Sequence, residues 1–294
     1  MISVSCFGEI LWDVFPSYRR IGGAPLNVAL RMHSLGASMH MISRLGKDAD
    51  GEEILKYLKE RGLSSDLIQM DAQHKTGTVD VHLDKTRTAT YTINKPVAWD
   101  AIELTSEMKK AVSTSDALIY GSLATRSSRS EETLKALLKG ARFKIFDMNL
   151  RPPHYEMDRL IELMLAADLV KLNDEELYEI ARHLNIEGNT ITQKMINLSR
   201  WVSSEVIICV TKGAEGAQLL YKGDMYSNSG YPVQVADTVG AGDSFLATLC
   251  FYLLNKNAPQ DALDQACAMG SLVASKEGAI PTITPEEIKI LIQS

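Results

Sequence analysis

The sequence predicts an α/β fold in which helices cover a mostly parallel central sheet. Short apolar runs alternate with amphipathic segments along most of the 294 residues, which is the pattern of consecutive βαβ units. The 45% of hydrophobic residues can fill a sizeable core. No repeat, low-complexity tract or linker separates two domains, so we expect a single domain over residues 1–294.

Six short apolar runs are the expected strands, and several of them are followed directly by polar residues or glycine. In an open α/β sheet, ligands collect at the carboxyl ends of the strands, so the residues after each run are candidate site residues. The runs span residues 2–7, 39–45, 117–120, 144–148, 169–172 and 206–210. The candidates that follow them are Gly8, Glu9, Asp13, Asn149, Arg151, Asn173, Glu176, Thr211, Gly213 and Gly216.

Two of the expected helices have clear ends. Asp50 is the expected N-cap of a helix over residues 51–61, and Gly62 is placed to end that helix in a left-handed conformation. Pro25 suits the first turn of a helix that ends at Gly36. Further helices are expected over residues 262–276 and 285–292.

Residues 76–93 break the alternation of strands and helices. Two strand-like stretches surround a polar turn at residues 84–87, with no helix between them. With the segment near residues 12–22, they predict a small β-lid, discontinuous in sequence, from about residues 12–22 and 76–97. Alternating apolar residues such as Val79, Val81 and Leu83 are suited to pairing with a second copy, because uncovered strand edges are a liability in a monomer. A homodimer through the lid is therefore an expectation.

The composition argues against two classes of partner. A net charge of −6 and a pI near 5.6 leave no broad basic field, so we expect no nucleic-acid partner. No apolar run approaches the roughly 20 residues that a membrane helix needs, and the first residues lack the basic segment of a signal peptide. The four cysteines are far apart in apolar surroundings, which is typical of buried thiols in a cytoplasmic protein.

Residues 237–245 read Asp-Thr-Val-Gly-Ala-Gly-Asp-Ser-Phe and lead directly into an apolar, helix-like stretch. Gly240 and Gly242 lack a Cβ, so the turn can bring backbone N–H groups close to a phosphate, where the helix dipole adds attraction. Asp243 lies among those donors and would repel a phosphate if it were only a cap, which favours a role as proton acceptor beside the transferring group. The alternative is that Asp243 caps the helix and the glycines make a turn.

A second glycine-rich turn, at residues 22–27, also enters a helix. Gly22 and Gly23 expose backbone that a polyhydroxy ligand can approach closely, and the Asn27 amide offers hydroxyl groups both a donor and an acceptor. The structural alternative is a tight loop with a helix cap. Neither turn matches the P-loop or the dinucleotide fingerprint, so a phosphate site would be of another design.

The polar residues after the other strands have structural alternatives as well. Asp13 can be a turn residue, and Asn149 can form an Asx turn. Asn173 can cap a helix, with Glu176 completing a capping box. The loop from residue 213 to residue 216 can be an ordinary hairpin loop.

Together, these motifs resemble those of the ribokinase-like (pfkB) carbohydrate kinases. Residues 237–245 resemble the C-terminal signature of that family, and residues 22–29 its N-terminal one. Further matches cover nearly the whole chain: Gly46, Asp48, Gly51 and residues 147–151, 173–176 and 211–216. The resemblance implies a three-layer α/β/α ribokinase-like domain with a mostly parallel sheet and a small β-lid. It also implies an enzyme that binds ATP and Mg²⁺ and phosphorylates a sugar hydroxyl.

By position, the resemblance implies a catalytic group made of Asp243, the general base, with Gly240, Ala241 and Gly242 as the anion hole. The nucleotide would contact Asn173, Glu176, Thr211, Gly213, Gly216, Gly240 and Gly242, and Glu176 would reach Mg²⁺ through water. The sugar would contact Asp13, Gly22, Gly23, Asn27, Arg151 and Asp243. The family often uses a monovalent cation near Asp237, so activation by K⁺ is an expectation. Cys267 stands where some members place an asparagine near the adenine.

Residues 8–16, 22–25 and 96–100 look most like the fructokinases of this family, which convert fructose to fructose 6-phosphate. Trp12 and Trp99 are suited to packing against the apolar face of the sugar, and hinge packing is the structural alternative for both. Within the family, the alternatives are a ribokinase, a 2-keto-3-deoxygluconate kinase and a nucleoside kinase. The alternative from another class is a catalytically silent sugar-sensing protein on the same fold.

Overall fold

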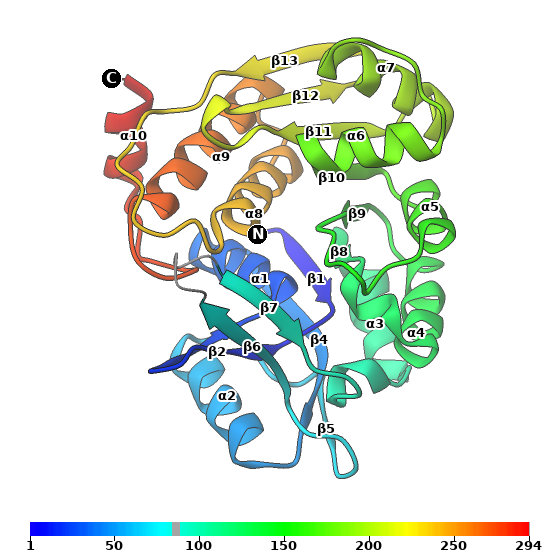
Figure 1. Ribbon diagram of the computed structural model, residues 1–294, viewed down its shortest axis with the longest axis vertical. Helices are drawn as coiled ribbons and strands as arrows, with labels where there is room; N and C mark the ends of the chain where they lie inside the picture. The colour runs from blue at the N-terminus through cyan, green and yellow to red at the C-terminus, as the bar shows by residue number, and fades with distance from the viewer. Residues whose placement is uncertain (84–88, 294) are drawn as a thin grey trace.

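A nine-stranded sheet runs through the centre of the protein (Figure 1), as seen in a computed structural model that describes residues 1–83 and 89–293. Strands β5, β4, β1, β8, β9, β10 and β11 lie side by side and parallel, and β12 and β13 continue the sheet antiparallel. The six predicted strands are confirmed to within one residue at each end. The bounds are β1 Ser3–Phe7, β4 Ser38–Gly46, β5 Ile68–Asp71, β8 Ala117–Gly121, β9 Lys144–Asp147, β10 Leu169–Asn173, β11 Ile207–Thr211, β12 Ala217–Tyr221 and β13 Asp224–Asn228.

Helices cover both faces of this sheet and make the three layers that the sequence predicts. Helices α1, α2, α8 and α9 contribute to the core on one face, and α10 packs against α9. Helices α3 to α7 contribute to the core on the other face. Their bounds are α1 Ala24–Ser34, α2 Ala49–Glu60, α3 Ser106–Thr114, α4 Ser128–Leu138, α5 Met157–Leu165, α6 Asp174–His183, α7 Ile191–Val202, α8 Ala241–Leu254, α9 Pro259–Ala274 and α10 Pro285–Gln293.

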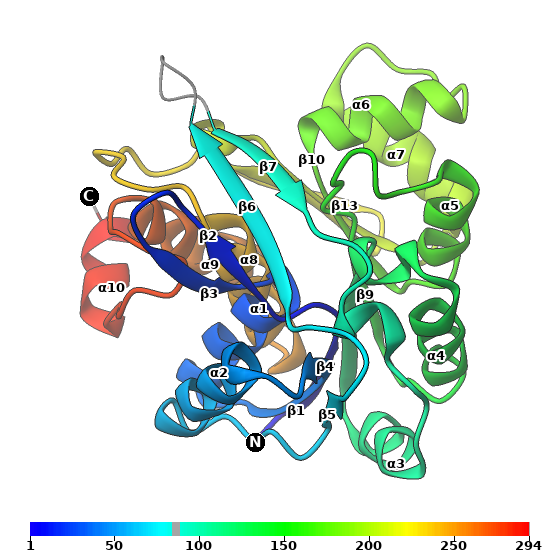
Figure 2. The same ribbon diagram turned by 60° about the horizontal axis from the view of Figure 1, so that its bottom comes forward.

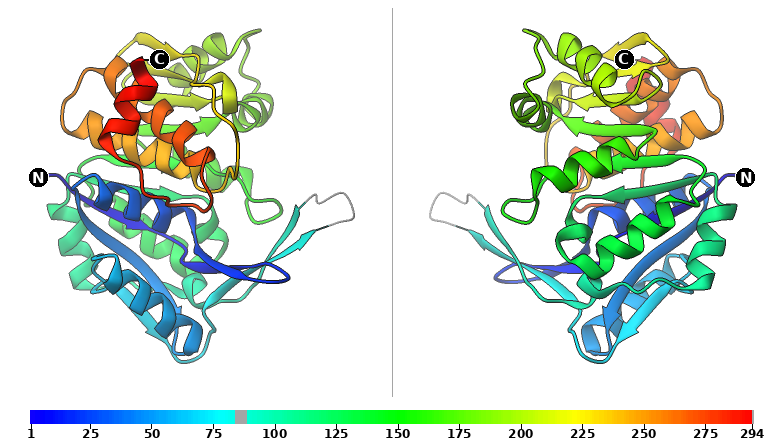
Figure 3. Two further views of the ribbon diagram at one scale, coloured as in Figure 1. Left: turned by 90° about the vertical axis from the view of Figure 1, so that its left-hand side faces the viewer. Right: turned by 90° about the vertical axis from the view of Figure 1, so that its right-hand side faces the viewer.

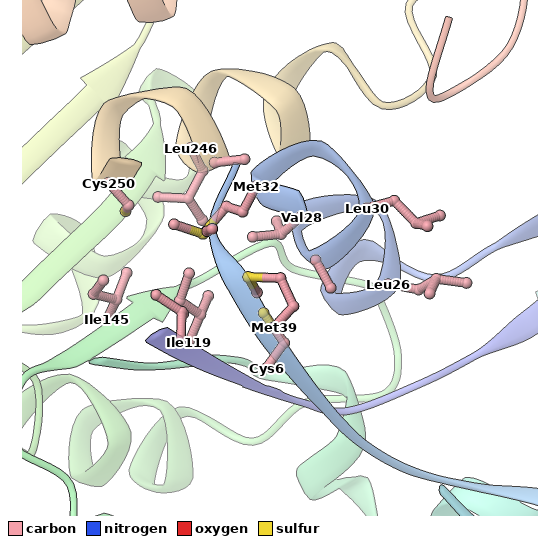
Figure 4. Packing of buried hydrophobic residues seen from close by; sticks show 14 of the residues in the cluster. Cys6, Leu26, Val28, Leu30, Met32, Met39, Ile119, Ile145, Leu246 and Cys250 are labelled. Atoms are coloured by element: carbon pink, nitrogen blue, oxygen red, sulfur yellow. The ribbon is translucent and has the colours of Figure 1, made fainter. Parts of the chain in front are cut away.

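The core between the sheet and helices α1 and α8 fixes these two helices against each other (Figure 4). Cys6, Ile119 and Ile145 rise from neighbouring strands, and Met32 of α1 and Leu246 of α8 close over them. All five side chains are buried. Burying one such aliphatic side chain stabilises the fold by roughly 1.5–3 kcal/mol. The two helices therefore present their N-termini to one end of the sheet in a fixed relation.

The structure bears on the state of the cysteines and on the presence of a membrane-spanning helix. All four cysteines are free and buried. Among the helices formed by residues 1–83 and 89–293, none has the length and apolar character needed to cross a bilayer.

A four-stranded sheet, in the order β3–β2–β6–β7, stands off the main sheet (Figures 2 and 3). Its strands are β2 Leu11–Val14, β3 Arg19–Gly22, β6 Gly77–Leu83 and β7 Ala89–Ile93. The two segments that the sequence assigned to a lid thus pair with each other, β2 running parallel to β6. The polar turn expected at residues 84–87 lies outside the described residues.

The base of this lid is tied to α2 by Asp48. Its carboxylate accepts hydrogen bonds from the backbone N–H of Gly51 at 2.8 Å and from the Thr76 backbone N–H at 2.8 Å and hydroxyl at 2.7 Å. Asp48 is therefore the N-cap of α2, and the prediction that Asp50 is the cap was wrong. Asp50 lies within the first turn and pairs with Arg19 of the lid instead. Gly62 follows α2 with a φ of 71°, as predicted.

We expect Asp48→Ala to lower the free energy of unfolding by about 1–3 kcal/mol, because the α2 cap and the bonds to Thr76 are lost together. Asp50→Ala removes a half-exposed ion pair and serves as the matched control, with an expected cost below about 1 kcal/mol. Urea denaturation of both variants measures the difference. Equal stabilities would contradict the assignment of the cap to Asp48.

Candidate active site

Polar side chains gather where the parallel strands end, under the lid. Asp147 ends β9, Asn173 ends β10 and Thr211 ends β11; the strand register sets Asn173 beside Thr211 and Asp147 beside Lys171. Glu9 follows β1, two strands further along the sheet. The N-terminus of α8 enters the same region, since a Cβ on Gly242 would lie 3.7 Å from Lys171 Nζ. The residues that the sequence analysis expected at the carboxyl ends of the strands thus lie at one edge of the sheet.

Helix α8 begins with a glycine N-cap, which has no side chain to cap the first amide groups. Its N-cap is Gly240 in a left-handed conformation with a φ of 77°, and a glycine offers no side chain to accept a hydrogen bond from the first turn. A Cβ on Gly240 would overlap the backbone of Ala279, so both the φ value and the close packing require glycine. The N–H groups of Gly242 and Asp243 belong to the first helical turn, which has no intrahelical acceptors. This end of α8 is therefore suited to binding an anion.

The Asp243 side chain does not cap its own helix. Its Oδ2 accepts a hydrogen bond from Asn27 Nδ2 at 2.8 Å, and Asn27 lies in the first turn of α1. The alternative that Asp243 is a capping residue is therefore wrong. The hydrogen bond brings together the two glycine-rich turns singled out in the sequence, although they are more than 200 residues apart.

The environment of Asp243 holds its carboxyl group in a state that can accept and release a proton near neutral pH. Loss of solvation, together with the nearby Asp147 carboxylate, raises the pKa of Asp243 to about 6, although the Asn27 hydrogen bond and the charges of Lys171 and Arg151 lower it. A general base works best with a pKa near the pH at which it operates. The carboxylate is thus tuned for proton transfer.

Two further carboxyl groups in this cleft have raised pKa values. Burial raises the pKa of Glu9 to about 7 and that of Asp13 to about 6, and the Asp243 charge contributes to both shifts. The guanidinium of Arg151, which is exposed after β9, lowers the pKa of both groups. A cluster of titratable groups with shifted pKa values is typical of a functional site.

Glycines leave the space that these carboxyl groups occupy. A Cβ on Gly22 would lie 2.5 Å from Asp13 Oδ2. A Cβ on Gly23, whose φ is 113°, would overlap the backbone oxygen of Glu9. Of the predicted sugar-contact residues, Asp13 and Gly22 therefore lie in direct contact, and Gly23 lies against the backbone of Glu9.

A cavity of about 620 Å³ lies beside the N-terminus of α8. Three predicted nucleotide contacts line it, namely Thr211, Gly213 and Gly216, together with Gly242 of the turn. Phe245 and the buried Cys267 form part of its wall, so the predicted departure at Cys267 falls inside this cavity. The loop that carries Gly213 and Gly216 joins the antiparallel strands β11 and β12, so it is a hairpin loop and a cavity wall at once.

Asn173 and Glu176 form the capping box that the sequence suggested. Asn173 Oδ1 accepts from the Glu176 backbone N–H, and Glu176 Oε2 accepts from the Asn173 backbone N–H, both at 2.8 Å. Glu176 Oε1 accepts from the Leu150 backbone N–H at 2.7 Å, which fixes the loop after β9. Burial raises the pKa of Glu176. The pair organises two loop segments at the edge of the cleft.

Sequence reasoning missed Lys171. This lysine lies in the middle of β10, is only 6% exposed, and places its Nζ 3.1 Å from Asp147 Oδ1. Burial alone would lower its pKa, but the carboxylates of Asp147 and Glu176 raise the pKa above its usual value, so the ammonium stays charged. Its Nζ lies 3.7 Å from the position that a Cβ of Gly242 would occupy, beside the free amides of α8. A lysine inside an apolar strand was the signal that could have revealed it.

Comparison with known proteins decides the family. Residues 13–286 match the pfkB family carbohydrate kinases. The chain belongs to this family. A probable fructokinase-4 from Arabidopsis thaliana is 27% identical, over 98% of this chain and 95% of that protein. A fructokinase from Escherichia coli is 28% identical, over 89% of this chain and 88% of that protein.

Solved structures show the same pfkB fold. A fructokinase from Xylella fastidiosa with bound ATP superposes with a TM-score of 0.85 at 24% identity, covering 99% and 98% of the two chains. A fructokinase variant from Vibrio cholerae, bound to fructose, ADP and potassium ion, gives 0.83 at 22%, covering 99% and 98%. A 2-dehydro-3-deoxygluconokinase from Thermotoga maritima gives 0.86 at 18%, covering all of both chains.

Both tryptophans that the sequence analysis suggested for the sugar face are buried in the structure. Trp99 lies in the short 3₁₀ helix η1 (Ala98–Ala101) and is fully buried, with the Arg126 guanidinium stacked over its ring at 3.9 Å. It therefore presents no surface to a sugar. Trp12 is also buried, and Arg19 stacks over its ring at 4.1 Å. Trp99 supports the base of the lid, because Gly77 of β6 packs directly against it, and Trp12 belongs to the lid strand β2 itself.

The raised pKa of Asp243 predicts an acid limb in the activity of this pfkB kinase. Asp243 accepts a proton only when ionised, so kcat/KM should fall as the pH drops through about 6 and should level off above it. Asn27→Ala removes a hydrogen bond that lowers the pKa of Asp243, so the limb should move to higher pH. Initial rates measured between pH 5 and 8, roughly the range around this pKa, test both statements.

The control for this pH profile is Asn197→Ala on α7. The Asn197 amide donates to the Glu187 carbonyl, away from the cleft, so its removal should leave the limb in place. An Asn27→Ala profile with an unmoved limb would contradict the role of the Asn27 hydrogen bond.

Proposed function

We propose that this pfkB kinase transfers the γ-phosphate of ATP to the C6 hydroxyl of fructose, giving fructose 6-phosphate. The hydrogen bond from Asn27 to Asp243 carries the proposal. It joins the glycine-rich turn at residues 22–27, proposed to bind the sugar, to the turn at residues 237–245, proposed to bind the phosphate, and the Asp243 carboxyl group, with a pKa of about 6, lies between them. The cavity beside Gly242 has the volume and position suited to a nucleotide. The choice of fructose rests on residues 8–16, 22–25 and 96–100, and on relatives named as fructokinases.

In this proposal, Asp243 takes the proton from the sugar hydroxyl as the new oxygen–phosphorus bond forms. Phosphoryl transfer passes through a loose transition state, so catalysis depends on alignment and on stabilising charge on the equatorial oxygens. The free N–H groups of Gly242 and Asp243 and the positive end of α8 supply that stabilisation. Lys171 adds a fixed positive charge directly behind the turn.

The residues at the cleft fit a magnesium ion that arrives with the nucleotide. Among residues 1–83 and 89–293, no three His, Cys, Asp or Glu side chains form a ready-made metal cluster. Asp147 Oδ2 is nevertheless buried, close to Glu176, and has no hydrogen-bond partner in the part of the chain that the structure describes. We propose that Asp147 and Glu176 hold Mg²⁺, with Glu176 acting through water since its oxygens already accept backbone N–H groups. When bound, the metal neutralises charge on the phosphates.

The sugar is proposed to lie between the lid and the turn at residues 22–27. Asp13 and Arg151 contact its hydroxyl groups, and the backbone at Gly22 and Gly23 lets it approach closely. Closure of the lid would exclude water, which otherwise competes for the phosphoryl group. The lid strand β7 lies at the edge of its sheet, so the proposal includes pairing of lid edges in a homodimer. It also includes a cytoplasmic location, for which the four free, buried cysteines are the support.

The alternative substrates within the family are ribose and 2-keto-3-deoxygluconate. The second is retained because the T. maritima protein with the same fold is a 2-dehydro-3-deoxygluconokinase. An ADP-release assay over a panel of sugars distinguishes them. We expect kcat/KM for fructose to exceed that for ribose and for 2-keto-3-deoxygluconate by about 10-fold or more, because a site built for one set of hydroxyls leaves polar groups unpaired with another. A higher kcat/KM for either rival sugar would reverse the choice of substrate.

Asp243→Asn tests the catalytic role against a silent sugar sensor. The substitution keeps the shape but removes the base, so kcat should fall by roughly 10²–10⁴ while ATP still binds. Sugar binding by thermal shift without ATP turnover in the wild-type protein would favour the sensor. Near-normal turnover in the variant would refute Asp243 as the base.

A further inference from the structure

Arg20 links the lid to the turn that precedes α8. It lies on β3, and its Nη1 donates to Asp237 Oδ2 at 2.8 Å, although the two residues are 217 positions apart. Only 34% of the Arg20 side chain and 21% of the Asp237 side chain are exposed. Partial burial weakens the screening that makes most surface ion pairs ineffective.

Asp237 is a junction between three segments. Its Oδ1 accepts from the Val239 backbone N–H at 3.0 Å, which shapes the turn that leads to the anion hole. Its Oδ2 accepts from the Gly278 backbone N–H at 3.2 Å as well as from Arg20. The loop beyond Gly278 packs against Gly240 through Ala279. The direction of the Asp237 carboxylate therefore decides how the turn and this loop fit together.

A monovalent cation at Asp237, expected from the family resemblance, does not fit these contacts. Both oxygens of the Asp237 carboxylate already accept hydrogen bonds, and a permanently charged guanidinium lies against one of them. A potassium ion at the same carboxylate would face repulsion from that guanidinium or would have to displace it. A fructokinase variant from V. cholerae has been solved with fructose, ADP and potassium ion bound.

We propose that Arg20 is a positioning residue that takes the place of a monovalent cation at Asp237, so that phosphotransfer does not require potassium. The inference rests on the proposed kinase function and adds to it. Arg20 holds the Asp237 carboxylate from the lid side, and the carboxylate in turn holds the turn whose amides receive the phosphate.

The position of Arg20 on the lid also couples the two substrates. Arg20 pairs with Asp13 in the β2–β3 register, so both side chains leave the same face of the lid. The Tyr18 ring lies 4.9 Å from the guanidinium and restricts its direction. A sugar that engages Asp13 therefore positions the strand that carries Arg20. Sugar binding and the geometry of the phosphate turn are thus linked through one side chain.

The test compares Arg20→Ala with Arg19→Ala in buffers that contain K⁺, Na⁺ or a bulky organic cation at equal ionic strength. Arg19 is the neighbouring arginine of β3, but it pairs with Asp50 and Glu53 of α2. We expect the wild type and Arg19→Ala to change kcat by less than about 2-fold between buffers. Arg20→Ala should lose about 10-fold or more in kcat without K⁺ and regain much of it as K⁺ is added, with saturation.

Two further variants separate positioning from simple stability. Arg20→Lys keeps a positive charge and should retain kcat without K⁺ better than Arg20→Ala does. Asp237→Ala removes the acceptor, so K⁺ should not rescue it. The thermal midpoint gives a readout that does not depend on catalysis: K⁺ should raise it relative to Na⁺ in Arg20→Ala only.

Three results would overturn the proposal: a saturable K⁺ requirement of the wild type, an unchanged kcat in Arg20→Ala, or a loss in Arg20→Ala that K⁺ does not restore. Failure of the proposed kinase function can be told apart from failure of the inference about Arg20. If no sugar is phosphorylated, the thermal midpoints still decide whether Arg20 excludes potassium from Asp237.

Discussion

The hydrogen bond between Asn27 Nδ2 and Asp243 Oδ2 joins the N-terminal turns of α1 and α8, and the chemistry of the cleft depends on it. It keeps a carboxylate in a site where loss of solvation disfavours the charge, and it directs one oxygen of that carboxylate. The bond exists because α1 and α8 pack side by side over the same strands, as Figure 4 shows. A second contact one turn along α1, from Arg31 Nε to Ser244 Oγ at 3.1 Å, keeps the two helices in register.

Around this hydrogen bond, glycines stand at positions where any side chain would overlap a neighbouring group. Gly22 leaves room for the Asp13 carboxylate, and Gly240 allows the turn to approach Ala279. The exposed amides at α8 and the buried ammonium of Lys171 bring positive charge to one face of the cleft. The carboxyl groups of Glu9, Asp147 and Asp243 bring negative charge to the same cleft, and burial raises the pKa of Glu9 and of Asp243. A reaction that moves a proton and a phosphoryl group needs both kinds of charge within a few ångströms.

The sequence predicted the fold and most of the cleft because both follow from local patterns. Apolar runs of strand length mark the parallel strands, and the two glycine-rich turns carry their own chemistry. What it missed depends on tertiary contacts. Asp48 and Asp50 are two residues apart, and only the path of the chain out of β4 decides which carboxylate reaches the Gly51 N–H. Trp99 has a side chain suited to a sugar face, but Arg126 and Gly77 enclose it. The Arg20–Asp237 pair joins opposite ends of the sequence, which no local pattern can reveal.

A crystal structure of the protein with fructose, Mg²⁺ and a non-hydrolysable ATP analogue tests the central claim most directly. The account predicts that an Asp243 carboxylate oxygen lies about 2.6–3.2 Å from the primary hydroxyl oxygen of the sugar. It also predicts that the terminal phosphate of the analogue accepts hydrogen bonds from the Gly242 and Asp243 backbone N–H groups. A complex in which Asp243 stays away from every sugar hydroxyl, with Glu9 or Asp13 next to the reacting oxygen, would contradict it.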